Sequence, residues 1–340
     1  MLRFLLSLLL GLSLFSSCER KPKTPPSVIF DGFMDVNDLY TLYLLSRSPK
    51  VNLTGVTISG SNDYYFNQAG NHVESILDLA QKSTIPVSSL PSTTFCSAST
   101  LPANWSKPVD NFADFNLPQS PVSPLNITGS ELMYNLLNES KDKVTIFCCG
   151  ALNNLANLIS TYPSLLSKIE RIIILSGDLH TTEEITLPIN PHFEQASSYN
   201  IYIDPCAARI VLASGIPITL IPLSVVTLVN NTQEIFDKYA HPPQNPGAAF
   251  VLKALKSHFN SNSILSFCTF WDAIGMMTLI EPKIVSLKKT SINFLTEGDD
   301  SGHIIEIGKD SVYKIGFPVD LCTSINPDLF YKTFFNMINE

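Results

Sequence analysis

Short apolar runs alternate along the chain with stretches whose apolar residues recur every three or four positions. Apolar and β-branched residues predict strands at 27–30, 51–59, 144–147, 171–177 and 216–223. Helical periodicity follows several of them, as at 38–46, 71–81 and 153–160. Strands that are apolar on both faces and alternate with helices are typical of a parallel sheet covered by helices. The pattern therefore predicts an α/β fold.

Three segments lack any sustained period. Residues 88–125 are rich in Ser and Pro, and 178–196 and 228–246 are similar, so we expect long surface excursions there. No internal repeat and no basic linker divides the remainder. We therefore expect residues 27–340 to form one domain.

The first residues have the pattern of a targeting segment. Arg3 precedes an apolar stretch at 4–15, which is followed by two serines, Cys18 and a charged, Pro-containing run. This order predicts a signal peptide at 1–17 and a linker at 18–26. The Phe-Ser-Ser-Cys ending resembles a bacterial lipobox, so lipidation of Cys18 is expected; plain secretion and an uncleaved anchor are the alternatives. The protein is expected to be secreted or held at the cell envelope.

The composition of the chain limits the classes of molecule that it is expected to bind. The 340 residues are 45% hydrophobic and 15% charged, with a net charge of -8, which argues against binding to nucleic acid or to an anionic membrane surface. No apolar run beyond residue 20 is long enough to span a bilayer, so membrane contact is expected only through the N-terminal lipid. The widely spaced cysteines fit neither a zinc motif nor a dense disulfide framework. Most are interpreted as buried hydrophobic residues, with one or two disulfides of undetermined pairing.

Polar side chains follow the predicted strands. Because ligands bind at the carboxyl ends of parallel strands, we expect these residues to converge on one cleft. Acids gathered there repel one another unless a cation joins them, and oxygen ligands favour calcium or magnesium. For each residue alone, helix capping or turn formation is the alternative. The expected set is Asp31, Asp35, Asn37, Asp38, Asn62, Asn153, Asn200 and Asp272.

Six motifs in order make the chain similar to the inosine-uridine-preferring nucleoside hydrolase family over about residues 26–338. They are VIFDGFMDVNDLYTLYLL (28–45), GVTISGSN (55–62), GALNNLA (150–156), ILSG (174–177), SYNIYIDPCAA (198–208) and Trp271-Asp272. The resemblance implies a Rossmann-like, mostly parallel sheet flanked by helices, with a calcium ion at its carboxyl rim. It also implies hydrolysis of the N-glycosidic bond of ribonucleosides and, by analogy, a homo-oligomer.

Position by position, the resemblance also implies residue roles. The metal carboxylates fall on Phe33, Asp38 and Asp272, a metal-binding backbone carbonyl on Asn153, and the base on Asn37. The positions that contact the substrate are Asn62, Asn200, Ser198, His192 and Asp272.

Two of these residues do not suit the chemistry. Phe33 cannot ligate a metal through its side chain, and the amide of Asn37 cannot serve as a base. Ser198 stands where the family has Glu, and Asp35, where the family has Gly, is a candidate substitute for the missing ligand or base. The sequence leaves two hypotheses open: a nucleoside hydrolase with reduced or altered activity, and an inactive member that binds ribosyl ligands or serves as a structural envelope lipoprotein.

Overall fold

A mostly parallel sheet forms the centre of the molecule in the computed structural model, which describes residues 24–60, 63–96, 117–176, 199–259, 269–294, 304–308 and 315–340. Within these residues the sheet has eight strands in the order β2-β1-β5-β6-β7-β10-β8-β9. All neighbours from β2 to β10 pair in parallel, whereas β8 and β9 are antiparallel. The strands are β1 (Ser27–Gly32), β2 (Asn52–Ile58), β5 (Val144–Cys148), β6 (Ile169–Leu175), β7 (Ile218–Ile221), β8 (Val285–Phe294), β9 (Ile304–Glu306) and β10 (Phe317–Ile325).

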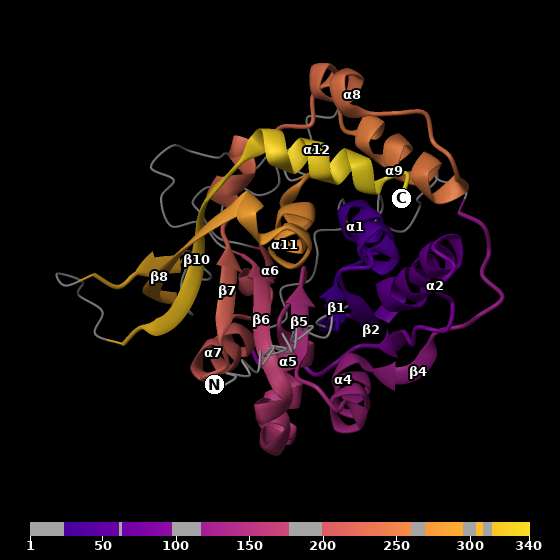
Figure 1. Cartoon of the computed structure of the whole chain (residues 1–340). Helices are drawn as coiled ribbons and strands as arrows, with labels where there is room; N and C mark the ends of the chain where they lie inside the picture. The colour runs from indigo at the N-terminus through magenta and orange to yellow at the C-terminus, as the bar shows by residue number, and fades with distance from the viewer. Residues whose placement is uncertain are drawn as a thin grey trace, which may run out of the picture.

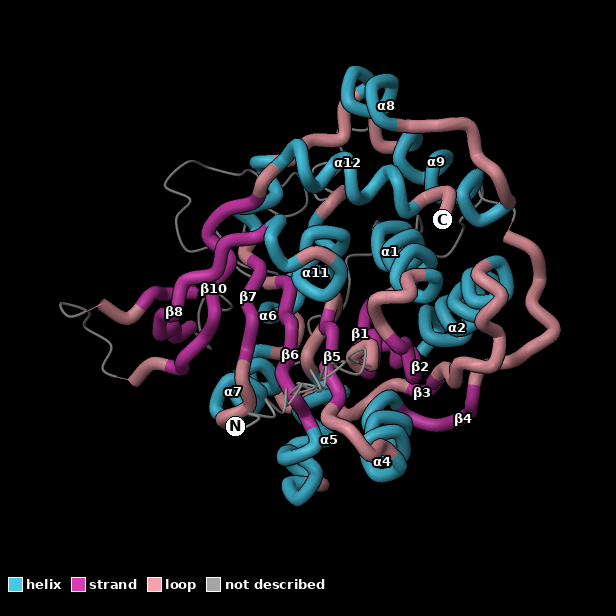
Figure 2. Tube along the Cα trace, in the orientation of Figure 1, coloured by secondary structure: helices cyan, strands magenta, loops and turns pink. Residues whose placement is uncertain are grey.

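Helices cover both faces of this sheet (Figure 1, Figure 2). The core on one face includes residues of α1 (Val36–Arg47), α2 (Asp63–Leu79), α9 (Pro246–Ser257), α11 (Trp271–Ile280) and α12 (Pro327–Met337). The core on the other includes α4 (Gly129–Glu139), α5 (Asn153–Thr161) and α7 (Pro205–Ala213). Successive strand residues alternate between the two cores, as Ile146 and Phe147 do. The α/β prediction is confirmed, and burial on both faces explains why the strands are continuously apolar.

Two of the predicted excursions contain regular structure. Ser88–Leu90 forms β3, which pairs in parallel with β4 (Leu125–Thr128), and the segment 228–246 contains α8 (Gln233–Tyr239). The Thr232 side chain caps α8 by accepting from the Ile235 amide, and Phe236 packs edge-on against Phe335 of α12. The prediction missed this helix because a tertiary contact stabilises it rather than a repeating apolar pattern. Residues 178–196 lie outside the described residues.

The remaining short elements are α6 (Tyr199–Tyr202) and the 3-10 turns η1 (Pro163–Lys168), η3 (Leu223–Leu228) and η4 (Pro282–Ile284). No helix in the described part of the chain is both long and apolar enough to span a bilayer.

A disulfide joins Cys96 to Cys206 of α7 across 110 positions of sequence. Asp204, the N-cap of α7, supports the same junction because its carboxylate accepts from the amides of Phe95, Cys96 and Ala207. The sequence left this pairing open. Cys148, Cys149 and Cys322 are free and buried, as expected of small hydrophobic residues, whereas Cys18 and Cys268 lie outside the described residues.

Candidate functional site

Two aspartates shape the turn between β1 and α1. Asp35 is the N-cap of α1, and its Oδ1 accepts from the amides of Asn37 at 2.7 Å and Asp38 at 3.0 Å. The Asp38 side chain in turn bonds to the backbone of this turn, because its Oδ2 accepts from the amides of Met34 at 2.6 Å and Asp35 at 3.3 Å. Met34 has a φ of 66°, a left-handed conformation that is uncommon for a residue other than glycine. The capping box therefore holds a strained turn and fixes where the Asp38 carboxylate points.

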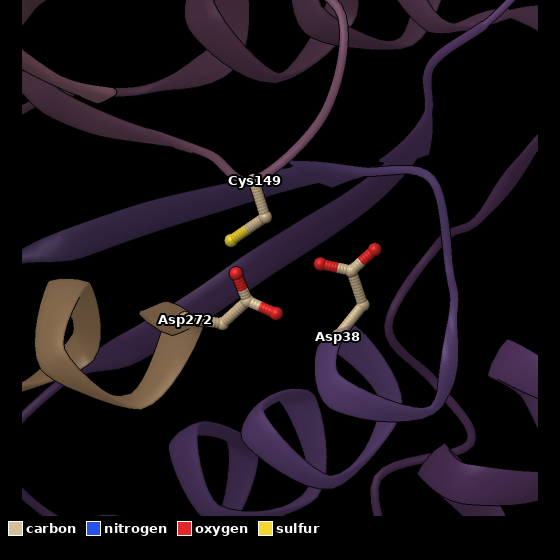
Figure 3. Close-up of side chains that lie close together, drawn as sticks. All are labelled: Asp38, Cys149 and Asp272. Carbon is tan, nitrogen blue, oxygen red and sulfur yellow. The ribbon is translucent and has the colours of Figure 1, made fainter. Parts of the chain in front are cut away.

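Asp38, Cys149 and Asp272 meet at the carboxyl rim of the sheet (Figure 3). Asp38 comes from the first turn of α1, Asp272 from the first turn of α11, and Cys149 directly follows β5. The ligand atoms that the three side chains offer all lie within 4.8 Å of one another. The side chains point toward a common centre from three elements that are distant in sequence (Figure 3). We call these three residues the rim cluster.

The rim cluster is buried and rich in acids. Asp38 is 2%, Cys149 5% and Asp272 7% exposed. Burial raises the pKa of the Asp38 carboxyl well above its usual range, and repulsion from Asp272 and Asp35 adds to the effect. Burial, with repulsion from Asp35, likewise raises the pKa of Asp272. Burial and the nearby carboxylates raise the pKa of the Cys149 thiol. Negative charge here is costly unless a proton or a cation offsets it.

Buried asparagine amides connect the strand ends around the rim cluster. Asn200 Nδ2 donates to the carbonyl oxygens of Cys149 at 3.0 Å and Leu175 at 2.8 Å, which joins the ends of β5 and β6. Asn153 Nδ2 donates to Gly60 at 3.0 Å, and the Asn153 carbonyl accepts from Asn157 at 2.8 Å. Both side-chain amides therefore hold backbone segments together around the rim cluster. The assignment of the Asn153 carbonyl to metal binding and of Asn200 to the substrate stays a prediction.

Asp31 lies at the same end of β1 but has its own partners. It is fully buried, and its Oδ1 accepts from Thr57 Oγ1 and Asn154 Nδ2, each at 2.7 Å. Burial raises the pKa of Asp31 to about 7, against the opposing effect of these hydrogen bonds. The Asp31 side chain thus connects β1 to β2 and α5, while its backbone carbonyl accepts from the Cys149 amide at 2.7 Å. Asp31 is not one of the three side chains of the rim cluster.

The structure also describes Phe33 and Asn37, the residues at the two positions where the family has acids. Phe33 is partly buried and packs against the core that contains α1 and α11. Asn37 is 3% exposed, and no donor in the described part of the chain contacts its Oδ1. Asp35 is the N-cap of α1, and one of its carboxylate oxygens accepts the capping hydrogen bonds. Asn62, His192, Ser198 and Cys18 lie outside the described residues, so their predicted roles stay predictions.

Cys149 is the residue of the rim cluster that the sequence analysis missed. Its position gives the one available signal, since it directly follows a predicted strand, as the rim acids do. Because a cysteine after an apolar run is most often a buried packing residue, that position alone does not distinguish the two roles.

Comparison with known proteins agrees with this architecture. A family model described as "Inosine-uridine preferring nucleoside hydrolase" matches residues 28–332. The solved structure of an inosine-uridine preferring nucleoside hydrolase from Bacillus anthracis superposes with a TM-score of 0.72 at 21% identity, over 92% of this chain and 99% of that one. A plant nucleoside hydrolase, PpNRh1, gives a TM-score of 0.74 at 18% identity, over 93% and 99% of the two chains.

The fold and the rim thus define a nucleoside hydrolase-type α/β protein. The chain belongs to the inosine-uridine preferring nucleoside hydrolase family. Among curated relatives, the pyrimidine-specific ribonucleoside hydrolase RihA of Klebsiella pneumoniae is 30% identical over 186 residues. That alignment covers 54% of this chain and 57% of the relative, so the chain spans little more than half the length of this relative.

The calcium ion that the resemblance implies fits this donor set poorly. Calcium takes six to eight oxygen ligands. The rim cluster supplies two carboxylates and a thiol, and Phe33 presents an apolar ring where a third carboxylate is expected. Among the described residues Asp38 Oδ1 is buried without a hydrogen-bond partner, so one strong oxygen acceptor is available, but the side chains of the rim cluster offer a hard ion too few oxygens.

Proposed function

We propose that this protein binds ribonucleosides at the rim cluster and hydrolyses their N-glycosidic bond with reduced activity compared with family members that have an acid at the base position. The observation that carries this proposal is the meeting of Asp38 and Asp272 within 4.8 Å at the carboxyl rim. Membership of the family makes a riboside the expected ligand of that rim.

The chain's own residues account for binding better than for bond cleavage. Asp38 Oδ1 and the Asp272 carboxylate are acceptors for the hydroxyl groups of a ribose, and burial strengthens such hydrogen bonds. The same carboxylates can hold a water molecule against the sugar. Removing the water's proton is the weak step, because Asn37 offers an amide at the position of the base. Loss of a general base costs on the order of 10²- to 10⁴-fold in rate.

A binding protein without turnover is the second candidate function. Phe33 and Asn37 favour it, because together they remove an expected metal ligand and the expected base while the folded turn around them is kept. In that case ribosides bind and are released unchanged.

One assay separates the two functions. The protein is incubated with inosine, uridine and p-nitrophenyl riboside, with and without calcium, and riboside binding is measured by calorimetry. The proposal predicts binding with slow release of base. Asp38→Asn should abolish both, whereas the exposed control Asp142→Asn should change neither. Binding without any release supports the second function, and the absence of binding refutes both.

Restoring the missing acids tests the cause of the low rate. Phe33→Asp with Asn37→Asp should raise calcium affinity and ribosidase activity together, while Asn37→Asp alone should raise them less. A double variant that binds calcium but gains no activity would show that substrate contacts have also been lost. Wild-type turnover equal to that of family members with an acidic base would show that another residue has replaced Asn37.

We also propose that the mature protein is a lipoprotein of the cell envelope, attached through Cys18, and that it acts on small ribosides and not on nucleic acid. The targeting pattern of residues 1–18 and the net charge of -8 support this proposal. Assembly into a homo-oligomer rests on analogy with the family and is tested by sedimentation.

A further inference from the structure

We propose that Asp38, Cys149 and Asp272 bind a thiophilic divalent metal ion of the zinc type, in place of the calcium that the fold implies. The three side chains come from α1, the end of β5 and α11, and their ligand atoms lie within 4.8 Å of one another. Four-coordinate zinc at 2.0 to 2.3 Å from its ligands holds neighbouring ligand atoms roughly 3.5 Å apart. The three donors therefore lie close to the spacing that one such ion requires.

An unpartnered oxygen at the rim points independently to a ligand. Asp38 is only 2% exposed, and no group in the described residues donates a hydrogen bond to its Oδ1, whereas Oδ2 is bound by the Met34 and Asp35 amides. One oxygen of Asp38 faces the other two side chains (Figure 3). A buried acceptor without a donor is rare in a folded protein and calls for a proton or an ion.

The concentration of acidic groups in the rim cluster also indicates a bound cation. The rim cluster holds two carboxylates and a thiol whose ligand atoms all lie within 4.8 Å of one another. Asp38 and Asp272 take no part in the salt bridges found among the described residues. A divalent cation would neutralise two negative charges in a place where water cannot.

The donor chemistry selects the ion. A thiolate favours zinc, cobalt and cadmium over calcium, and two carboxylates with one thiolate complete three of the four positions of a tetrahedral ion. The fourth position stays open to water or to a hydroxyl of a ligand. Phe33, which removes an oxygen needed by calcium, removes nothing that a four-coordinate ion requires. Metal binding as proposed here does not depend on whether ribosides are hydrolysed.

Cobalt titration of the full chain tests the site, because a cobalt–thiolate bond gives a near-ultraviolet charge-transfer band that oxygen ligands do not give. We expect this band at one cobalt per chain, its loss on addition of zinc and its persistence in excess calcium. Cys149→Ser should abolish the band and weaken zinc binding at least 10- to 100-fold, which is the range found when only the surroundings of a ligand change. Asp38→Asn should weaken zinc binding as well.

Cys322→Ser is the matched control, since Cys322 is also free and buried but lies in β10. It should leave the band and the zinc affinity unchanged. A wild type without the band, a band displaced equally by calcium, or a band that survives Cys149→Ser in protein whose circular dichroism is native would each overturn the proposal. The wild-type titration decides the matter even if Cys149→Ser does not fold.

Discussion

Asp31→Asn should remove one defined contribution to the pH dependence of stability. Asp31 is fully buried, and burial raises its pKa from 3.8 to about 7 in the folded protein. The folded state therefore holds a proton that the unfolded state releases between pH 4 and pH 7. The contribution of this proton to stability is complete below about pH 4 and is lost as the pH rises through 7.

The size of the effect follows from the pKa. One pKa unit corresponds to about 1.4 kcal/mol, so Asp31 should lower the free energy of unfolding by roughly 3 kcal/mol between pH 5 and pH 8. The asparagine that replaces Asp31 in the variant is a neutral mimic of the protonated acid, and its oxygen can still accept from Thr57 and Asn154. The stability of the variant relative to wild type should therefore increase by about that amount over this range.

Urea denaturation at several pH values measures this difference directly. Other buried acids with a raised pKa, such as Glu74, whose pKa burial raises to about 7, affect both proteins alike and cancel. The exposed Asp142→Asn variant controls for the change in net charge. Parallel curves of stability against pH for wild type and Asp31→Asn would refute the reasoning, because they would show that Asp31 is ionised in the folded protein.

Three further predictions concern the packing, the disulfide and the N-terminus. Gly275→Ala should cost about 1–3 kcal/mol by overpacking, because a Cβ there would lie 2.6 Å from Leu175 and 2.7 Å from Phe147, whereas Gly308→Ala, with no atom within 4 Å, should be nearly neutral in the same urea assay. Cys206→Ser should cost about 2–5 kcal/mol, and a reductant should destabilise wild type but not this variant. Metabolic labelling with a palmitate analogue should mark wild type and not Cys18→Ala, and equal labelling would contradict lipidation at this cysteine.

Local patterns determined the class of fold. Strand residues alternate between two faces, so continuous apolar runs such as 172–175 require that both faces be covered, and the intervening helical periodicity shows what covers them. The same logic located the rim, because the residue after a parallel strand lies at one known edge. Asp38 and Asp272 were predicted to meet there, and the structure places them together.

Contacts between distant segments decided the rest. No local pattern shows that Cys149 faces two carboxylates, that Cys96 pairs with Cys206, or that α8 forms against α12. Each of these contacts depends on the distance in space between residues that are far apart in the sequence. The periodicity of a single helix or strand carries no information about that distance.

The separation of two acids in one motif shows this limit most clearly. Asp31 and Asp38 stand seven positions apart, and the sequence offers them as equivalent rim carboxylates. Asp31 is the last but one residue of β1 and is enclosed by Thr57 and Asn154, whereas Asp38 follows a left-handed turn at Met34 that directs its carboxylate toward Asp272. The sequence by itself determined that acids gather at this rim. Only the packing of β2, α5 and α11 around these two buried acids decided that Asp31 is hydrogen-bonded by Thr57 and Asn154 and that Asp38 faces a thiol and a second carboxylate.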